Sequence, residues 1–187
     1  EKITGELAEG PKEKLDVRDV QTLANLVDKY KIDTIYNLAS LLSATAEKNP
    51  QLAFEIGLKG QYNVLEIARE KKCAVFFPSS IGSFGLTTPK DNTPQDTIQR
   101  PNTMYGVTKV SAELLGDYYF KRFGVDSRGV RFPGIISNVT LPGGGTTDYA
   151  VEIYYDAVKK GKFVSPLKKG TFLDMMYMPD AIKAALD

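Results

Sequence analysis

A tyrosine and a lysine stand four residues apart in the segment Tyr-Gly-Val-Thr-Lys, as Tyr105 and Lys109. On a helix this spacing brings both side chains to one face. A free tyrosine has a pKa of about 10, too high for a general base at neutral pH, but a nearby ammonium favours the phenolate and lowers that pKa. The pair could therefore remove a proton from a substrate alcohol while a hydride leaves its carbon.

Two other segments strengthen this interpretation, because the pair alone also arises by chance on any tyrosine-rich helix. Upstream, an apolar stretch ends in Pro78-Ser79-Ser80, which places a hydroxyl where it could hydrogen-bond the same substrate oxygen. Downstream, another apolar stretch ends in Arg131-Phe132-Pro133-Gly134, where the backbone could approach a flat cofactor ring. The order of the three segments favours a catalytic site over simple packing.

The elements that must position these residues follow from the apolar periodicity. We expect helices over residues 19–30, 50–72 and 103–123, and strands over residues 34–39, 74–77 and 127–132. A loop rich in small and polar residues covers 79–102. Strands that alternate with helices predict repeated β-α-β units, and hence an α/β fold with a Rossmann-like, doubly wound parallel sheet. In such sheets ligands bind at the carboxyl ends of the strands.

The composition narrows the class of protein. The chain has 187 residues, 42% of them hydrophobic, which is enough for one core of ordinary size. Its net charge of +1 gives no electrostatic reason to expect a nucleic acid or an anionic membrane as partner. Without histidine, and with one cysteine, neither the usual zinc ligand sets nor a histidine-dependent nucleophile is available. We therefore expect a small-molecule substrate, no metal and no membrane-spanning segment.

The single cysteine, Cys73, lies at the start of the predicted strand 74–77. One thiol cannot form an internal disulfide, so we expect Cys73 to pack in the core. This is consistent with a reducing intracellular compartment, and the choice between cytoplasm and mitochondrion stays open.

Four segments appear in the order found in the extended short-chain dehydrogenase/reductase family, which the chain resembles over essentially its whole length. They are Asn37–Ser40, Ser79–Gly85, Tyr105–Lys109 and Arg131–Gly134. That family uses a Ser/Thr, Tyr and Lys catalytic set with a nicotinamide cofactor. The resemblance implies that Tyr105 is the acid/base and that Lys109 lowers its pKa and holds the nicotinamide ribose. It also implies that Ser80 positions the reacting hydroxyl.

Within this family, the segment Gly145–Glu152 resembles the L-threonine 3-dehydrogenase group, as do Ala39–Ala44 and Pro133–Ser137. The resemblance implies a homodimer that oxidises the 3-hydroxyl of L-threonine to 2-amino-3-oxobutyrate with NAD. The implied cofactor contacts are Asp16, Val17, Leu38, Ala39, Ser40, Tyr105, Lys109, Pro133 and Ile135. The implied substrate contacts are Ser43, Ser79, Ser80, Tyr105, Thr146 and Thr147. The hydroxyls could instead cap helices or strand ends, and the apolar residues could simply pack.

Two departures from the family pattern stand out. Many members have an asparagine where this chain has Gly57, which removes a side chain that often braces the lysine and costs about 1 kcal/mol in a helix interior. The family's first strand and glycine-rich turn, which would seat the pyrophosphate on a helix N-terminus, are absent from the sequence. We therefore expect a part of a longer chain, with an incomplete cofactor-binding domain over residues 1–140 and the start of a substrate-binding region over 141–187.

Two other functions stay open. A nucleotide-sugar epimerase or dehydratase of the same family would share Ser80, Tyr105 and Lys109. It would also need basic residues for a diphosphate after Gly134, where this chain offers small hydroxyls and glycines over 137–143. The third possibility is a non-catalytic cofactor-binding scaffold, for which the missing glycine-rich turn is the argument.

Overall fold

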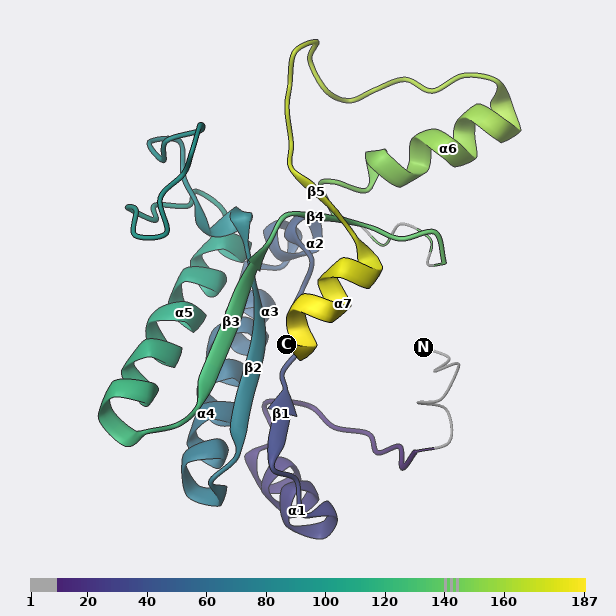
Figure 1. Cartoon of the computed structure of the whole chain (residues 1–187). Helices are drawn as coiled ribbons and strands as arrows, with labels where there is room; N and C mark the ends of the chain where they lie inside the picture. Colours follow the sequence, from purple (N-terminus) through teal and green to yellow (C-terminus); the bar gives the residue numbers. More distant parts are fainter. Residues whose placement is uncertain (1–9, 140, 142, 144) are drawn as a thin grey trace.

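The computed structural model describes residues 10–139, 141, 143 and 145–187. At its centre three parallel strands lie in the order β1-β2-β3 (Figure 1). They are β1 (Thr34–Tyr36), β2 (Ala74–Ser80) and β3 (Ser127–Phe132). Because all three run the same way, their carboxyl ends meet at one edge of the sheet. The predicted Rossmann-like parallel sheet is confirmed.

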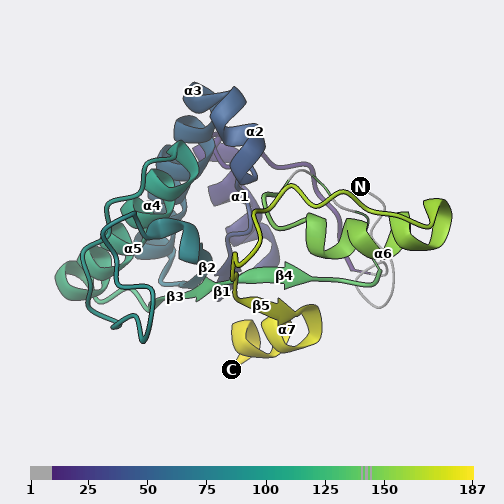
Figure 2. The ribbon, with the colours of Figure 1, turned by 90° about the horizontal axis from the view of Figure 1, so that it is seen from above.

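Helices cover both faces of this sheet, as a doubly wound fold requires. One face is covered by α1 (Val20–Tyr30), α4 (Gly60–Lys71) and α5 (Met104–Phe123), and the other by α7 (Met178–Leu186) (Figures 1 and 2). Side chains of β2 alternate between the two cores. Val75 packs with α1, α4 and α5, whereas Phe76 packs with Phe132 and with Ala181 of α7.

A second, smaller sheet follows β3 directly. Its strands β4 (Gly134–Ile136) and β5 (Met175–Tyr177) pair in parallel, with Gly134 opposite Met175. Between them α6 (Tyr149–Lys160) contributes no buried residue and lies apart from the main sheet in Figure 1. The sequence analysis did not predict α6, β5 or α7, and the domain boundary at residue 140 stays a prediction.

The helix starts follow from side-chain caps. Asp19 accepts a hydrogen bond from the backbone N–H of Thr22 at 3.0 Å, and Thr103 accepts one from Gly106 at 3.0 Å. These caps start α1 and α5 one residue after the predicted positions. Strand ends were predicted less well, because they depend on pairing. The predicted strand 34–39 already ends at Tyr36, whereas β2 continues to Ser80, which lies opposite Phe132.

The prediction of one continuous helix over 50–72 is wrong for the middle of this segment. The chain forms α3 (Pro50–Phe54), a π-helical turn η2 (Glu55–Lys59) and then α4. Gly57 lies in this turn, and a Cβ there would be 2.9 Å from Cβ of Thr108 on α5. The close approach of η2 to α5 therefore requires glycine at this position.

Two expectations drawn from composition can be compared with the structure. Cys73 is buried and its thiol donates to the carbonyl of Ile32 at 3.1 Å, which confirms its predicted place in the core. Within the described ranges, none of the helices combines the length and apolar character that a membrane span requires.

Candidate active site

Tyr105 and Lys109 occupy the first two turns of α5, where this helix passes the carboxyl end of β2. Lys109 is 8% exposed, and its Nζ donates to the carbonyl of Pro78 at 2.7 Å. The same Nζ lies 5.3 Å from the centre of the Tyr105 ring. The structure therefore brings the two predicted residues together beside the end of the strand.

Ser80 is the last residue of β2, and its hydroxyl and the ring of Tyr105 both lie next to Gly82. The backbone N–H of Gly82 donates to Ser80 Oγ at 3.0 Å. A Cβ on Gly82 would lie 3.1 Å from Cε1 of Tyr105 and 3.3 Å from Ser80 Oγ, so the hydroxyl and the ring approach the same point. All three residues of the predicted catalytic set thus converge at one place.

The pKa values of this set differ from the expectation in one respect. Burial raises the pKa of Tyr105 above its ordinary value, and a hydrogen bond with Ser80 offsets part of this rise. Burial also lowers the pKa of Lys109 to about 8. Burial thus raises the pKa of Tyr105 in this structure, in which the Lys109 ammonium donates to the Pro78 carbonyl, and the role of Lys109 in lowering that pKa stays a prediction.

A further glycine shapes the site. A Cβ on Gly106 would lie 2.3 Å from the carbonyl oxygen of Gly82, which is closer than any real contact. The absence of a side chain at Gly106 is what lets α5 approach the segment that follows Ser80. The sequence analysis did not identify this requirement, since it depends on two segments far apart in the chain.

Two of the predicted substrate contacts lie together. The hydroxyl of Ser43 donates to Thr146 Oγ1 at 3.5 Å, and the backbone N–H of Thr146 donates to Ser43 Oγ at 3.3 Å. Ser43 begins the short helix α2 (Ser43–Lys48), which the sequence analysis did not predict. Glu47 of that helix accepts from the backbone N–H of Met104 at 2.6 Å. This bond ties the helix that carries Ser43 to the start of α5.

Thr147 is half-buried next to Thr146, and its side chain packs against the backbone of β4. Its Cγ2 lies 2.9 Å from the place that a Cβ on Gly134 would take. Gly134 therefore has no room for a side chain, and the loop carrying both threonines is held close to the second sheet.

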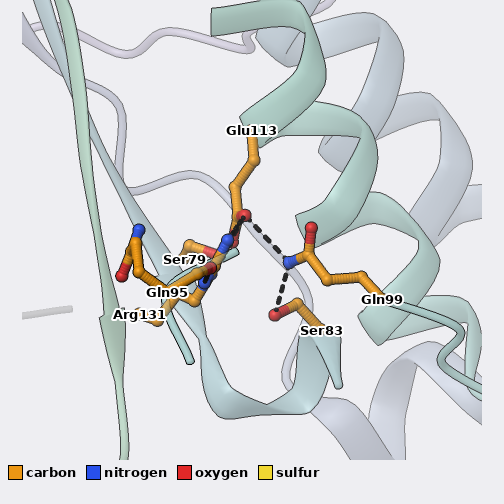
Figure 3. A network of polar contacts seen from close by, with 6 residues as sticks. All are labelled: Ser79, Ser83, Gln95, Gln99, Glu113 and Arg131. Carbon is orange, nitrogen blue, oxygen red and sulfur yellow. Dashed lines mark hydrogen bonds and ion pairs between the residues drawn. The ribbon is translucent and has the colours of Figure 1, made fainter. Parts of the chain in front are cut away.

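Ser79 belongs to a different polar network, shown in Figure 3. Its hydroxyl donates to the carboxylate of Glu113, which also accepts from Arg131 at 2.7 Å and from Gln99 at 2.9 Å. Gln99 reaches Ser83 Oγ at 3.1 Å. Because neighbouring side chains of a strand face opposite ways, Ser79 cannot share the orientation of Ser80. Its predicted contact with the substrate stays a prediction.

Glu113 is the centre of this network and joins β2, β3, α5 and the loop that contains Gln99. Burial alone would raise the pKa of Glu113, but hydrogen bonds from Arg131, Ser79 and Gln99 together lower it below the ordinary value. The sequence analysis missed this residue. The spacing of Tyr105, Lys109 and Glu113 could have indicated Glu113 from the sequence, because it puts all three on one helix face.

We expect the substitution Glu113→Gln to reduce the free energy of unfolding at pH 7 by about 2 kcal/mol, since Arg131 loses a charged partner. The lowered carboxylate pKa stabilises the wild type above pH 4.5, its ordinary value, and this stabilisation is lost as the pH falls through the lowered folded-state pKa. Urea titrations between pH 7 and low pH should show the two proteins converging in acid.

Asp156→Asn is the control, because the Lys160–Asp156 pair has side-chain exposures of 62% and 31% and should contribute little. A stability difference between Glu113→Gln and wild type that does not shrink in acid would contradict the carboxylate's role.

Asp16 and Val17, the two predicted cofactor contacts that precede β1, interact with other residues of this chain. Arg18 bonds to the exposed Asp16 carboxylate and thereby lowers its pKa to about 2. The side chain of Val17 packs against Gly60, and its carbonyl accepts from Asn63 at 3.0 Å. Val17 is thus fixed against α4, while Asp16 lies at the surface.

The other predicted cofactor contacts lie at or beyond strand ends. Leu38 is 67% exposed and Ala39 is also exposed, both directly after β1. Ser40 donates to the carbonyl of Leu41 at 3.3 Å. Pro133 joins β3 to β4, and Ile135 is the middle residue of β4. Of these residues, Ala39 and Ser40 line a small cavity together with Lys109.

Comparisons with known proteins match nearly the whole chain. The model of the NAD dependent epimerase/dehydratase family matches residues 4–186. An uncharacterised epimerase/dehydratase of Staphylococcus saprophyticus is 58% identical over 180 residues, which make up 96% of this chain and 56% of that protein. A relative in Staphylococcus aureus is 59% identical over 177 residues, 95% of this chain and 55% of that protein.

Solved structures add a more specific likeness. The L-threonine dehydrogenase of Clostridium difficile has a TM-score of 0.91 at 59% identity, over 93% of this chain and 55% of that one. The L-threonine 3-dehydrogenase of Trypanosoma brucei has a TM-score of 0.92 at 43% identity, over 97% of this chain and 57% of that one. The expected resemblance to this group is confirmed, and the chain spans about 55% of the length of the relatives it matches.

Proposed function

The chain belongs to the NAD dependent epimerase/dehydratase family, and from this we propose that the full protein is an oxidoreductase that oxidises L-threonine at its 3-hydroxyl. The product would be 2-amino-3-oxobutyrate. The observation that carries the proposal is the 43% to 59% identity with solved L-threonine dehydrogenases across the region that holds Ser80, Tyr105 and Lys109.

The residues around the strand ends fit the nicotinamide end of NAD. Lys109 offers an ammonium at the carboxyl end of β2, and Leu38 offers apolar surface at the end of β1. An ammonium suits ribose hydroxyls, and exposed apolar side chains suit a flat ring. When bound, NAD supplies the acceptor for the hydride that leaves C3 of threonine.

The chain's own residues would handle the proton. Ser80 Oγ would hold the substrate hydroxyl beside Tyr105, and the Tyr105 oxygen, once deprotonated, would take the hydroxyl proton as the C3–O double bond forms. The Lys109 ammonium would favour the phenolate after moving from the Pro78 carbonyl toward ribose and phenol. Because burial alone raises the pKa of Tyr105, this role would depend on the nearby ammonium to stabilise the phenolate.

The amino-acid end of the substrate would contact the Ser43–Thr146 pair. Both hydroxyls are small and uncharged, and α2 links them to the start of α5 through Glu47 and Met104. Hydroxyls and backbone amides can bind a carboxylate without a full positive charge. A nucleotide-sugar diphosphate would call for lysine or arginine at this place.

The predicted homodimer stays a prediction. It is supported by apolar side chains on α5 that are exposed in the single chain. Leu114 is 62% exposed, Tyr118 54% and Phe120 60%. Apolar groups of this size on one helix suit contact with a second copy.

We expect the full-length protein to form NADH from NAD and L-threonine. Absorbance of NADH at saturating NAD would measure this, with L-serine and a nucleoside diphosphate sugar as the alternative substrates. Selective oxidation of L-threonine is the expected result. An epimerase or dehydratase returns the hydride to its substrate and forms no net NADH, so the nucleotide sugar would be followed by chromatography. Conversion of the nucleotide sugar alone would favour that function, and NAD binding without turnover of any substrate would favour the non-catalytic scaffold.

A further inference from the structure

The loop over residues 84–102 joins the segments that carry Ser80 and Tyr105. It begins after the short turn η3 (Ile81–Ser83), which directly follows Ser80, and it ends directly before the cap of α5. Near the start of the loop, Thr88 Oγ1 donates to a backbone carbonyl near its end at 3.2 Å, so the two ends lie close together. A side chain near the end of the loop is thus within reach of the turn after Ser80.

Gln99 is such a side chain, and it bonds in two directions (Figure 3). Its Nε2 donates to Ser83 Oγ at 3.1 Å and to Glu113 Oε2 at 2.9 Å. A primary amide nitrogen carries two donor hydrogens, so these bonds use both of them. Ser83 lies in the turn after Ser80, whereas Glu113 lies on α5, about two turns beyond Tyr105. The two bonds, which we call the Gln99 bridge, therefore join the two segments that carry the catalytic set.

The Glu113 end of the Gln99 bridge is fixed to the sheet. The carboxylate also accepts from Ser79 of β2 and from Arg131 of β3, the latter at 2.7 Å. The Arg131 and Glu113 side chains are only 20% and 16% exposed, and charge-assisted bonds of this kind are stronger than bonds between neutral groups. Glu113 is therefore a firm point from which Gln99 can hold a second segment.

The Ser83 end of the Gln99 bridge leads to the catalytic hydroxyl. Ser83 is fully buried and directly follows Gly82. The backbone N–H of Gly82 donates to Ser80 Oγ at 3.0 Å, and a Cβ on Gly82 would lie 3.1 Å from the ring of Tyr105. A shift of Ser83 would carry Gly82 with it and would change the separation of the Ser80 hydroxyl and the phenol.

We propose that Gln99 is a positioning residue, which sets the separation of Ser80 and Tyr105 by joining Ser83 to Glu113. In the part of the chain that the structure describes, no hydrogen bond connects Gln99 with Ser80 or Tyr105, so Gln99 acts through its two partners. The effect on catalysis rests on the proposed function, whereas the Gln99 bridge itself does not.

Gln99→Leu in the full-length protein tests the proposal, because leucine is similar in size and has neither donor. With complete folding verified by circular dichroism, kcat for NADH formation from L-threonine should fall by at least about 10-fold, since a misplacement of about 1 Å costs up to 10²-fold. The pH profile of kcat should also move to higher pH. The bond with Ser80 lowers the pKa of Tyr105, and a displaced Ser80 would lose this effect.

Ser83→Ala breaks the Gln99 bridge from its other end. We expect kcat to fall by a similar factor, and we expect the double variant to be no slower than the slower of the two single variants. Losses of kcat that multiply in the double variant would show that the two residues act independently, and they would overturn the proposal.

Amide hydrogen exchange of Gly82, followed by NMR, tests the Gln99 bridge without turnover. Exchange should be about 10-fold faster in Gln99→Leu than in wild type, because the turn that contains Gly82 loses its anchor. Gln95→Leu is the matched control. Gln95 is exposed in the same loop, and this variant keeps the backbone carbonyl that accepts from Arg131 at 2.9 Å. Its kcat and its Gly82 exchange should equal those of wild type.

The two readouts separate the possible failures. A wild-type kcat in Gln99→Leu would overturn the positioning role, and wild-type exchange of Gly82 would overturn the Gln99 bridge. If the wild-type protein itself failed to oxidise L-threonine, the proposed function would be refuted, and the exchange measurement would still decide whether Gln99 holds the turn after Ser80.

Discussion

Replacing Tyr105 with phenylalanine should lower kcat for NADH formation from L-threonine by roughly 10²- to 10⁴-fold, the usual contribution of a positioned acid/base. The substitution removes one oxygen and keeps the ring that packs against Gly82 and under the Lys109 ammonium. The fold should therefore survive. Steady-state kinetics of the full-length protein, with thermal unfolding measured on the same samples, would separate lost chemistry from lost structure.

Tyr154→Phe is the matched control, because Tyr154 lies on α6 and is 70% exposed. Its kcat should equal that of wild type.

The pH profile adds a second test. Since burial raises the pKa of Tyr105, the base form becomes more populated as pH increases, so wild-type kcat should rise from neutral toward alkaline pH. Wild-type kcat in Tyr105→Phe would remove Tyr105 from the chemistry.

The parts of the site that follow from local spacing could be predicted from the sequence. Tyr105 and Lys109 share a helix face because they are four residues apart, and Asp19 caps its helix because its carboxylate reaches an N–H three residues ahead. The parallel sheet followed from the alternation of apolar elements. None of these inferences needed knowledge of which distant segments touch.

The parts that were missed depend on contacts between distant segments. Arg131 of β3 bonds to Glu113 of α5, and Ser43 bonds to Thr146, which lies about 100 residues further along the chain. The π-helical turn at Gly57 lies so close to Thr108 of α5 that a Cβ would clash, and the helix propensities of single residues do not encode this approach. The rise of the Tyr105 pKa was not anticipated either, because it depends on how deeply the folded chain buries the phenol.

Gly106→Ala should destabilise the protein by about 2 kcal/mol and lower kcat by about 10²-fold, even though alanine is the better helix former. The new Cβ would lie 2.3 Å from the Gly82 carbonyl oxygen, a backbone atom that cannot rotate away. Either α5 or the segment after Ser80 must then move. Ser80 and Tyr105 would separate, and a displacement of about 1 Å between reacting groups is enough for the expected loss.

Gly116→Ala on the same helix is the matched control for this prediction. Its Cβ would approach two side chains, Ser127 Oγ at 2.9 Å and the Phe77 ring at 3.1 Å, and no backbone atom. Side chains can shift by a few tenths of an ångström, so helix propensity should offset part of the cost and the loss should be smaller than in Gly106→Ala. Urea unfolding and kcat of both variants would be compared with wild type. If Gly106→Ala were as stable and active as Gly116→Ala, the contact between α5 and Gly82 would not be what holds Ser80 against Tyr105.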